Sequence, residues 1–229
     1  MALRHKLASG SGWLAIGALA DYAMQFLVFT LLARLVTVTE LGIVAFALVL
    51  TDLGRIFVNG GRAEAMVQQP EWDDRLASVC HNRTLASAAL LAVVLAVGGG
   101  LLVERYYQPG SGLPTAALAL ILIIEAMRTI HGSKMRREFQ FRQLASRTIV
   151  GTVIASVIAV YMALNGAGVW ALVVQRLVAQ VVITILTVRS SRWKPAWVWN
   201  SPRLTEISGY TRKITASRGI EVALLRMPD

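Results

Sequence analysis

The stretch that decides the fold class is VWALVVQRLVAQVVITILTV, residues 169–188. Arg176 is its one charged side chain, and all its other residues are apolar or uncharged. A helix needs about 20 mostly apolar residues to cross the hydrocarbon core of a bilayer, and this stretch is long enough. We therefore predict that it crosses a membrane as an α-helix.

Five earlier stretches have a similar length and composition, at residues 12–33, 41–61, 85–103, 113–130 and 148–164. The whole chain agrees with them, because 55% of its 229 residues are hydrophobic and 16% are charged, whereas soluble domains are roughly 45–50% apolar and about 25% charged. The sequence predicts an all-α integral membrane protein whose six-helix transmembrane bundle occupies residues 1–200.

The basic residues indicate how the bundle is oriented. Cytoplasmic loops of membrane proteins are enriched in Lys and Arg. Here 17 of the 23 basic residues fall at the N-terminus, near residues 62–84 and 131–147, and in residues 189–218 of the tail. The intervening loops contain only Arg34 and Arg105. We expect the N-terminus and the tail to face the cytoplasm.

The net charge of +10 is explained by these loops, so it does not indicate a nucleic-acid partner. The sequence contains no P-loop, GxSxG or HExxH motif, and its single cysteine excludes an intrachain disulfide. We interpret His5, His81 and His131 as loop or helix-interface residues rather than metal ligands. We expect neither an enzyme nor a protein with a cofactor or metal.

Polar side chains within the spans are the candidates for a functional site. Six are ionisable, and each costs roughly 2.5–3.5 kcal/mol at the centre of a membrane helix, so we expect them to face one another or a wet cavity. Two acid–base pairs are three positions apart, and two further pairs, four positions apart, each include a glutamine. The candidates are Asp21, Gln25, Asp52, Arg55, Glu125, Arg128, Arg176 and Gln180.

Two interpretations of these residues are open. The acid–base pairs could be salt bridges that fix helix packing, and Arg128 could extend its charge to the membrane surface. Asp21 and Arg176 have no oppositely charged partner at helical spacing, which favours a position lining a cavity. Because Arg makes bidentate bonds to phosphate, such a cavity suits an anionic cargo. The third and fifth spans carry no charge, and we expect them to face lipid as supporting helices.

Residues outside the spans predict contacts with the membrane surface. Residues 133–144 form either a basic helix along that surface or a solvated loop. The aromatic residues expected at the level of the lipid headgroups are Tyr106, Tyr107, Trp193, Trp197 and Trp199.

Residues 201–229 differ from the bundle. The run from residue 214 begins like a seventh span, with a basic lead-in, but is too short to cross. Its pattern weakly repeats the start of the chain. We interpret residues 201–229 as a cytoplasmic linker and the start of a second lobe, which would make residues 1–200 one lobe of a repeated structure.

Four stretches carry a family resemblance: LLARLVTVTELGIVA at 31–45 followed by DLG at 52–54, AMVQQ at 65–69, MRREFQFR at 135–142 and GVWALVVQ at 168–175. With these the chain resembles the bacterial oligosaccharide and polysaccharide flippases of the multidrug/oligosaccharidyl-lipid/polysaccharide exporter superfamily. The resemblance implies two six-helix lobes facing a cavity, of which this chain supplies the N-terminal lobe. It also implies movement of undecaprenyl-diphosphate-linked oligosaccharide from the cytoplasmic to the periplasmic leaflet of the bacterial inner membrane, for lipopolysaccharide, capsule or exopolysaccharide.

The resemblance implies roles and partners as well. Arg128 and Arg176, with Arg55, would attract the diphosphate or acidic sugars, while the three acids would set cavity polarity or couple transport to protons or sodium. Membrane lipid and glycan polymerases or other assembly proteins would be partners. One alternative is a cation-coupled multidrug exporter, although three acids are matched here by three bases. Another is a non-transporting scaffold in a polysaccharide assembly complex.

Overall fold

The computed structural model describes residues 18–19, 21–106, 109–204 and 209, and these residues contain helices and no strand. The helices are an N-terminal helix, Asp21–Leu32, followed by α2 (Val38–Asn59), α3 (Arg62–Gln68), α4 (Asp74–Val94), a π-helical turn (Leu95–Gly99), α5 (Gly100–Tyr106), α6 (Gly112–Arg137), α7 (Phe141–Leu164) and α8 (Val169–Ser191).

The prediction of an all-α membrane protein is confirmed, with a difference in the number of long spans. Among the described residues, five helical segments are long and apolar enough to cross a membrane: α2, the continuous segment from α4 to α5, α6, α7 and α8. The helix expected over residues 12–33 is described from residue 21, as a shorter apolar helix, and residues 12–17 lie outside the described residues.

Two regions expected between the spans are largely helical, which corrects the loop expected over residues 62–84 and the solvated-loop alternative for residues 133–144. Residues 62–84 contain α3 and the first turns of α4, which begins where Asp73 accepts hydrogen bonds from the backbone N–H groups of Arg75 and Leu76. Residues 133–144, expected as a surface helix or a solvated loop, are the end of α6 and the start of α7. Hydropathy identified only the part of each helix that matches the hydrocarbon core.

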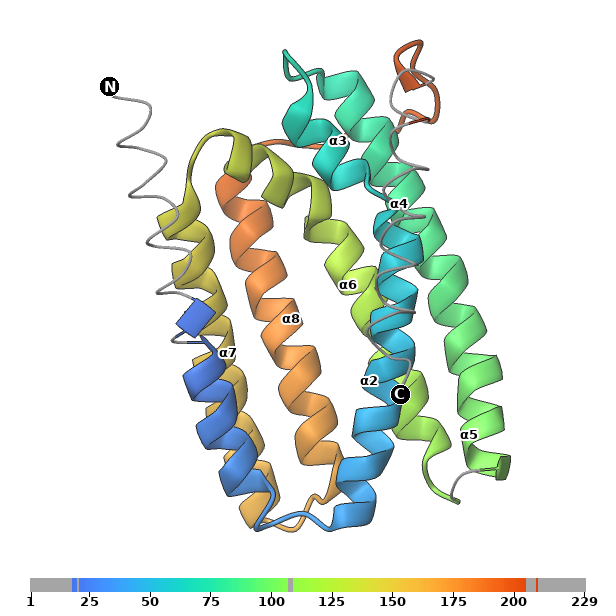
Figure 1. The fold of residues 1–229 in the computed structure, drawn as a ribbon, viewed down its shortest axis with the longest axis vertical. Coiled ribbons are helices and arrows are strands. Elements are labelled where there is room, and N and C mark those ends of the chain that lie inside the picture. The colour runs from blue at the N-terminus through green and yellow to red at the C-terminus, as the bar shows by residue number, and fades with distance from the viewer. Residues whose placement is uncertain (1–17, 20, 107–108, 205–208, 210–229) are drawn as a thin grey trace, which may run out of the picture.

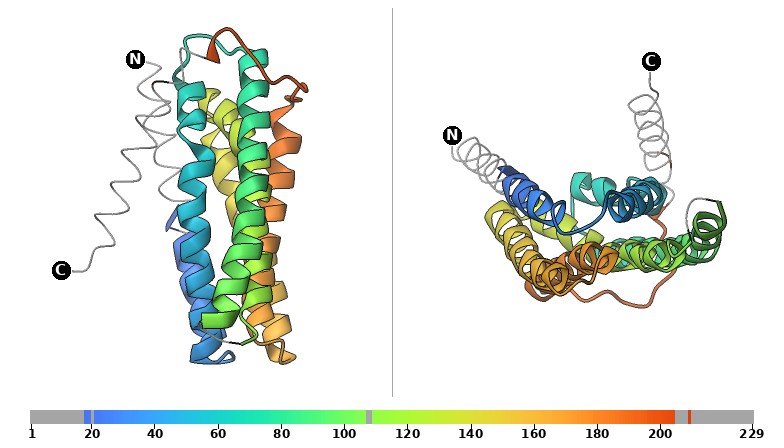
Figure 2. Two further views of the ribbon diagram at one scale, coloured as in Figure 1. Left: turned by 90° about the vertical axis from the view of Figure 1, so that its right-hand side faces the viewer. Right: turned by 90° about the horizontal axis from the view of Figure 1, so that it is seen from below.

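The helices form two layers. In the first, α7 packs on α8, α8 on α6, and α6 on α4, which gives the curved row in the right-hand view of Figure 2. The N-terminal helix and α2 make the second layer on one face of this row. We call the end where α3, the start of α4, the α6–α7 junction and the end of α8 meet the basic end; it is uppermost in Figure 1. The predicted basic loops therefore gather at one end.

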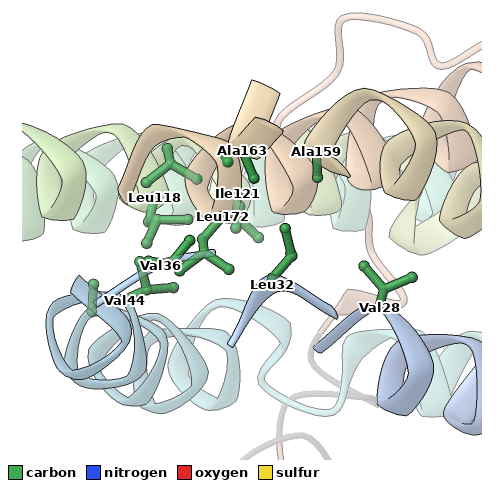
Figure 3. Packing of buried hydrophobic residues seen from close by; sticks show 12 residues of the cluster. Val28, Leu32, Val36, Val44, Leu118, Ile121, Ala159, Ala163 and Leu172 are labelled. Carbon is green, nitrogen blue, oxygen red and sulfur yellow. The ribbon is translucent and has the colours of Figure 1, made fainter. Parts of the chain in front are cut away.

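An apolar cluster joins the two layers at the opposite end. Val28 and Leu32 of the N-terminal helix and Val44 of α2 pack against residues of α6, α7 and α8, including Ile121 and Leu172 (Figure 3). Leu32 is fully buried. Because these side chains fill the space between the layers, the bundle is closed at this end.

Glu40 fixes the same end with polar contacts. Its carboxylate completes a capping box with Thr37 at the start of α2. The other carboxylate oxygen accepts a hydrogen bond at 3.0 Å from the backbone N–H of Val169, at the start of α8. One side chain thus caps two helices that belong to different layers.

At the basic end, residues 192–204 run in an extended path across α4. Trp193 was expected at the headgroup level, but it is only 6% exposed and packs in a cluster with Met66, Leu76 and Cys80. Its ring therefore contacts protein rather than lipid, although it lies at the expected end of the bundle, because the chain turns back over the bundle after α8. Trp197 is exposed, as expected, while Tyr107 and the run from residue 214 lie outside the described residues.

Candidate transport cavity

A cavity of about 820 Å³ lies between the two layers in the half of the bundle toward the basic end. The N-terminal helix contributes Asp21 and Gln25 to its lining, α6 contributes Glu125 and Arg128, and α7 and α8 complete it. The apolar cluster closes the space beyond it. The bundle therefore has a cavity with polar and charged lining residues in the half toward the basic end and is closed by apolar side chains at the other end.

A continuous chain of charges crosses from α2 through α6 to α8. Asp52 accepts a hydrogen bond from Arg55 at 3.0 Å, and Arg55 Nε pairs with Glu125 at 2.6 Å. Glu125 also pairs with Arg128 at 2.9 Å, and Arg128 donates to the Gln180 amide oxygen at 2.8 Å. The two acid–base pairs predicted from spacing are confirmed as contacts, and Arg55 links them into one network.

A second chain of hydrogen bonds crosses from α8 to α7 through the N-terminal helix. Arg176 Nη1 donates to the Gln25 amide oxygen at 3.3 Å. The Gln25 amide nitrogen donates to Asp21 at 2.7 Å, and the second oxygen of Asp21 accepts a hydrogen bond from the Thr152 hydroxyl at 2.6 Å. Both oxygens of Asp21 are thus engaged, whereas Arg176 contacts a neutral amide at a long distance.

The two chains meet at a second cavity of about 160 Å³. Asp21, Gln25 and Arg128 line both this space and the larger cavity. Arg176 and Gln180 line the smaller cavity but not the larger one. The eight predicted residues are therefore in one region, with Asp52 and Arg55 linked to the cavities through Glu125. Whether any of them binds a cargo stays a prediction.

The structure corrects three details of the expected site. Gln180, expected only to share a polar stripe with Arg176 on α8, hydrogen-bonds to Arg128 of α6. Arg128 is held inside the bundle by Glu125 and Gln180 and does not extend to the membrane surface. The fifth span, α7, is not only a supporting helix, because Thr152 contacts Asp21 and lines the smaller cavity.

Several lining residues carried no signal in the sequence. Thr148 and Thr152 of α7, Asn59 at the end of α2 and Thr129 of α6 are uncharged. A threonine in a membrane helix commonly bonds to its own backbone one turn earlier, as Thr148 does to Leu144. Composition alone could not distinguish that arrangement from the contact that Thr152 makes.

The histidines lie away from the cavity. His81 and His131 are buried beside each other, with ring centroids 5.7 Å apart, and His131 hydrogen-bonds to Ser191 at 2.6 Å. Within the described part of the chain, no group of three or more His, Cys, Asp or Glu side chains could hold a metal ion. Loop or helix-interface positions were expected for both residues, and both lie on helices, while His5 is outside the described residues.

Comparisons with known proteins agree with a role in making or exporting polysaccharide. Residues 31–227 match the family described as "Polysaccharide biosynthesis protein". The chain is 26% identical over 200 residues to the succinoglycan biosynthesis transport protein ExoT of Rhizobium meliloti (strain 1021), covering 87% of this chain and 40% of that protein.

A second relative is the teichuronic acid biosynthesis protein TuaB of Bacillus subtilis (strain 168). It is 23% identical over 200 residues, covering 85% of this chain and 41% of that protein. The chain thus spans about two-fifths of the length of the curated relatives it matches. No solved structure matches the chain.

Proposed function

This chain belongs to the polysaccharide biosynthesis protein family, and we propose that it supplies one lobe of a flippase for lipid-linked oligosaccharide. The cargo would be an undecaprenyl-diphosphate-linked oligosaccharide, moved from the cytoplasmic to the periplasmic leaflet of the bacterial inner membrane. The name of the ExoT relative, a succinoglycan biosynthesis transport protein, supports transport as the activity. We place the protein in the membrane so that the basic end and the N-terminus face the cytoplasm, because cytoplasmic loops are enriched in Lys and Arg.

The observation that carries the proposal is the imbalance between the two polar chains. Asp52, Arg55, Glu125 and Arg128 compensate one another through ion pairs of 2.6–3.0 Å. Arg176 instead makes a 3.3 Å bond to a neutral amide and faces the smaller cavity. Its guanidinium thus retains donors for an anion, and Arg binds phosphate through two parallel N–H···O bonds.

The volumes support a division of the cargo between the cavities. The larger one, of about 820 Å³, has room for several sugar units with water and is lined by hydroxyl, amide and charged groups that can hydrogen-bond to sugars. The smaller one, of about 160 Å³, suits a phosphate group beside Arg128 and Arg176. Asp21 borders both spaces and is linked to Arg176 through Gln25.

Complementation tests the proposal. A strain lacking the chromosomal gene would receive the gene with Arg176→Ala, Arg176→Lys or, as a control at an exposed site of the opposite end, Arg34→Ala, and exported glycan would be measured at matched protein levels. We expect export to fall at least tenfold with Arg176→Ala, partly recover with Arg176→Lys, and stay unchanged with Arg34→Ala. Unchanged export with Arg176→Ala at a normal protein level would show that Arg176 does not bind the cargo.

A further inference from the structure

The extended segment after α8 presents two tryptophans on the outside of the bundle. Trp197 is 78% exposed and Trp199 is 44% exposed, and their rings meet edge to face with centroids 5.4 Å apart. Figure 2 shows the segment passing along the face of the α4–α6–α8 row that is turned away from the N-terminal helix and α2. The pair is thus remote from both cavities and takes no part in the proposed transport path.

Hydrogen bonds to α4 fix this segment in place. The Asn82 amide nitrogen donates to the backbone carbonyls of Ala196 and Val198, at 3.0 and 2.9 Å. The backbone N–H of Ala196 donates to the Ser78 hydroxyl at 3.0 Å. The polar backbone of the segment therefore faces the protein, and Trp193 anchors its start in the buried cluster. The exposed side chains are consequently held in a defined position.

The position along α4 gives the depth of the segment in a membrane. The apolar run of this helix begins near residue 85, and a helix rises 1.5 Å per residue, so Asn82 lies about 5 Å and Ser78 about 10 Å beyond the edge of the hydrocarbon core. A bilayer of about 40–45 Å with a core of about 30 Å leaves a headgroup layer of roughly 5–8 Å on each side. Asn82 therefore lies within the headgroup layer and Ser78 just outside it, so the segment that they hold runs along the outer part of that layer.

The charge of the segment selects one class of headgroup. Arg189, Arg192 and Lys194 are exposed, and the sequence from residue 187 to residue 204 contains no Asp or Glu. Tryptophan favours the membrane interface because its ring is apolar and its N–H can hydrogen-bond. We propose that residues 189–199 form a binding site for anionic phospholipid headgroups, in which Trp197 and Trp199 rest at the glycerol level and the basic side chains contact the phosphate.

Lipid titration of the purified full chain tests the charged part of this site. Retained phosphatidylglycerol and phosphatidylcholine would be counted by native mass spectrometry for the protein, for Arg192→Gln/Lys194→Gln, and for the control Arg34→Gln/Arg105→Gln at the opposite end. A basic residue near an anionic surface contributes about 1 kcal/mol, or about fivefold in affinity. We expect phosphatidylglycerol to bind roughly 25-fold more weakly to the first variant, with phosphatidylcholine and the control unchanged. Equal retention by both variants would overturn the proposal.

Fluorescence tests the aromatic part through substitutions that leave the charges in place. Subtracting the emission spectrum of the Trp197→Phe/Trp199→Phe variant from that of the unchanged protein gives the emission of this pair. The Trp72→Phe variant is the control for loss of a tryptophan elsewhere. In vesicles containing phosphatidylglycerol, we expect lipids brominated near the glycerol to quench the emission of the pair. We also expect the quenching constant for aqueous iodide to be at least threefold lower in these vesicles than in detergent. Iodide access in vesicles equal to that in detergent would place the pair in water or against a protein and would overturn the proposal.

Discussion

Replacing Gly168 with alanine tests whether the Glu40 clamp holds the two layers together at the closed end. Gly168 has φ +53° and ψ −130°, and a Cβ atom there would overlap Glu40 Oε1. The backbone conformation alone costs an alanine about 1–2 kcal/mol. Displacing Glu40 also removes the cap on Val169, which costs about 1 kcal/mol more, and the overlap itself adds strain. We expect the free energy of unfolding to fall by about 2–4 kcal/mol.

Gly166 supplies the matched control, because it has φ +75° and open space around the position of a Cβ. Gly166→Ala should therefore show only the backbone cost. The measurement is equilibrium unfolding in mixed dodecylmaltoside and dodecyl sulfate micelles, followed by circular dichroism. In a Glu40→Ala background, Gly168→Ala should cost less than it does in the natural background, since the overlapping carboxylate is gone. Additive effects of Glu40→Ala and Gly168→Ala, or equal costs for the two glycines in the natural background, would refute the clamp.

Three further predictions concern the packing, the charges and the segment after α8. Gly151→Ala would place a methyl group against Ile183 and should lower stability by about 1–3 kcal/mol, measured by thermal melting; a smaller cost of Gly151→Ala in an Ile183→Ala background, where both γ carbons are absent, would confirm the steric cause. Glu125→Gln removes the acid shared by two arginines and should cost about 1–3 kcal/mol in the same assay, and an unchanged melting temperature would contradict the charge chain. Asn82→Leu leaves two carbonyls without their donor and should speed alkylation of the buried Cys80 several-fold; unchanged labelling would show that the segment stays in place without these bonds.

The fold could be predicted from the sequence where the membrane dictates it. Hydropathy placed the expected spans at 113–130 and 169–188 within helices α6 and α8, because both must match the hydrocarbon thickness. It could not show how far each helix continues into the headgroup region, where polar residues are equally compatible with helix and loop. Helix α4 therefore starts at Asp74, although its apolar run begins near residue 85.

Burial at the basic end was harder to predict, because it depends on contacts between distant segments. Trp193 is followed by Lys194 and Pro195, a pattern typical of a chain leaving the membrane. Its ring is buried because Asn82 and Ser78 bind the backbone a few residues later and hold the chain against α4. Neither polar residue differs, in the sequence, from one that faces solvent.

The membership of the site could be predicted because an unpaired charge in a bilayer is costly, so charged residues on separate spans must converge. The pairing of these residues could be predicted only in part. Contacts within a helix follow from helix geometry, whereas contacts between helices depend on how the helices pack and could not be predicted. Asp52 with Arg55 is of the first kind; Arg128 with Gln180 is of the second. The second kind also decides where charge is left to bind a ligand. Since Gln180 bonds to Arg128 rather than to its neighbour Arg176, the Arg176 guanidinium faces the cavity with a single weak contact to the described residues, and that difference makes it the strongest candidate for the anion.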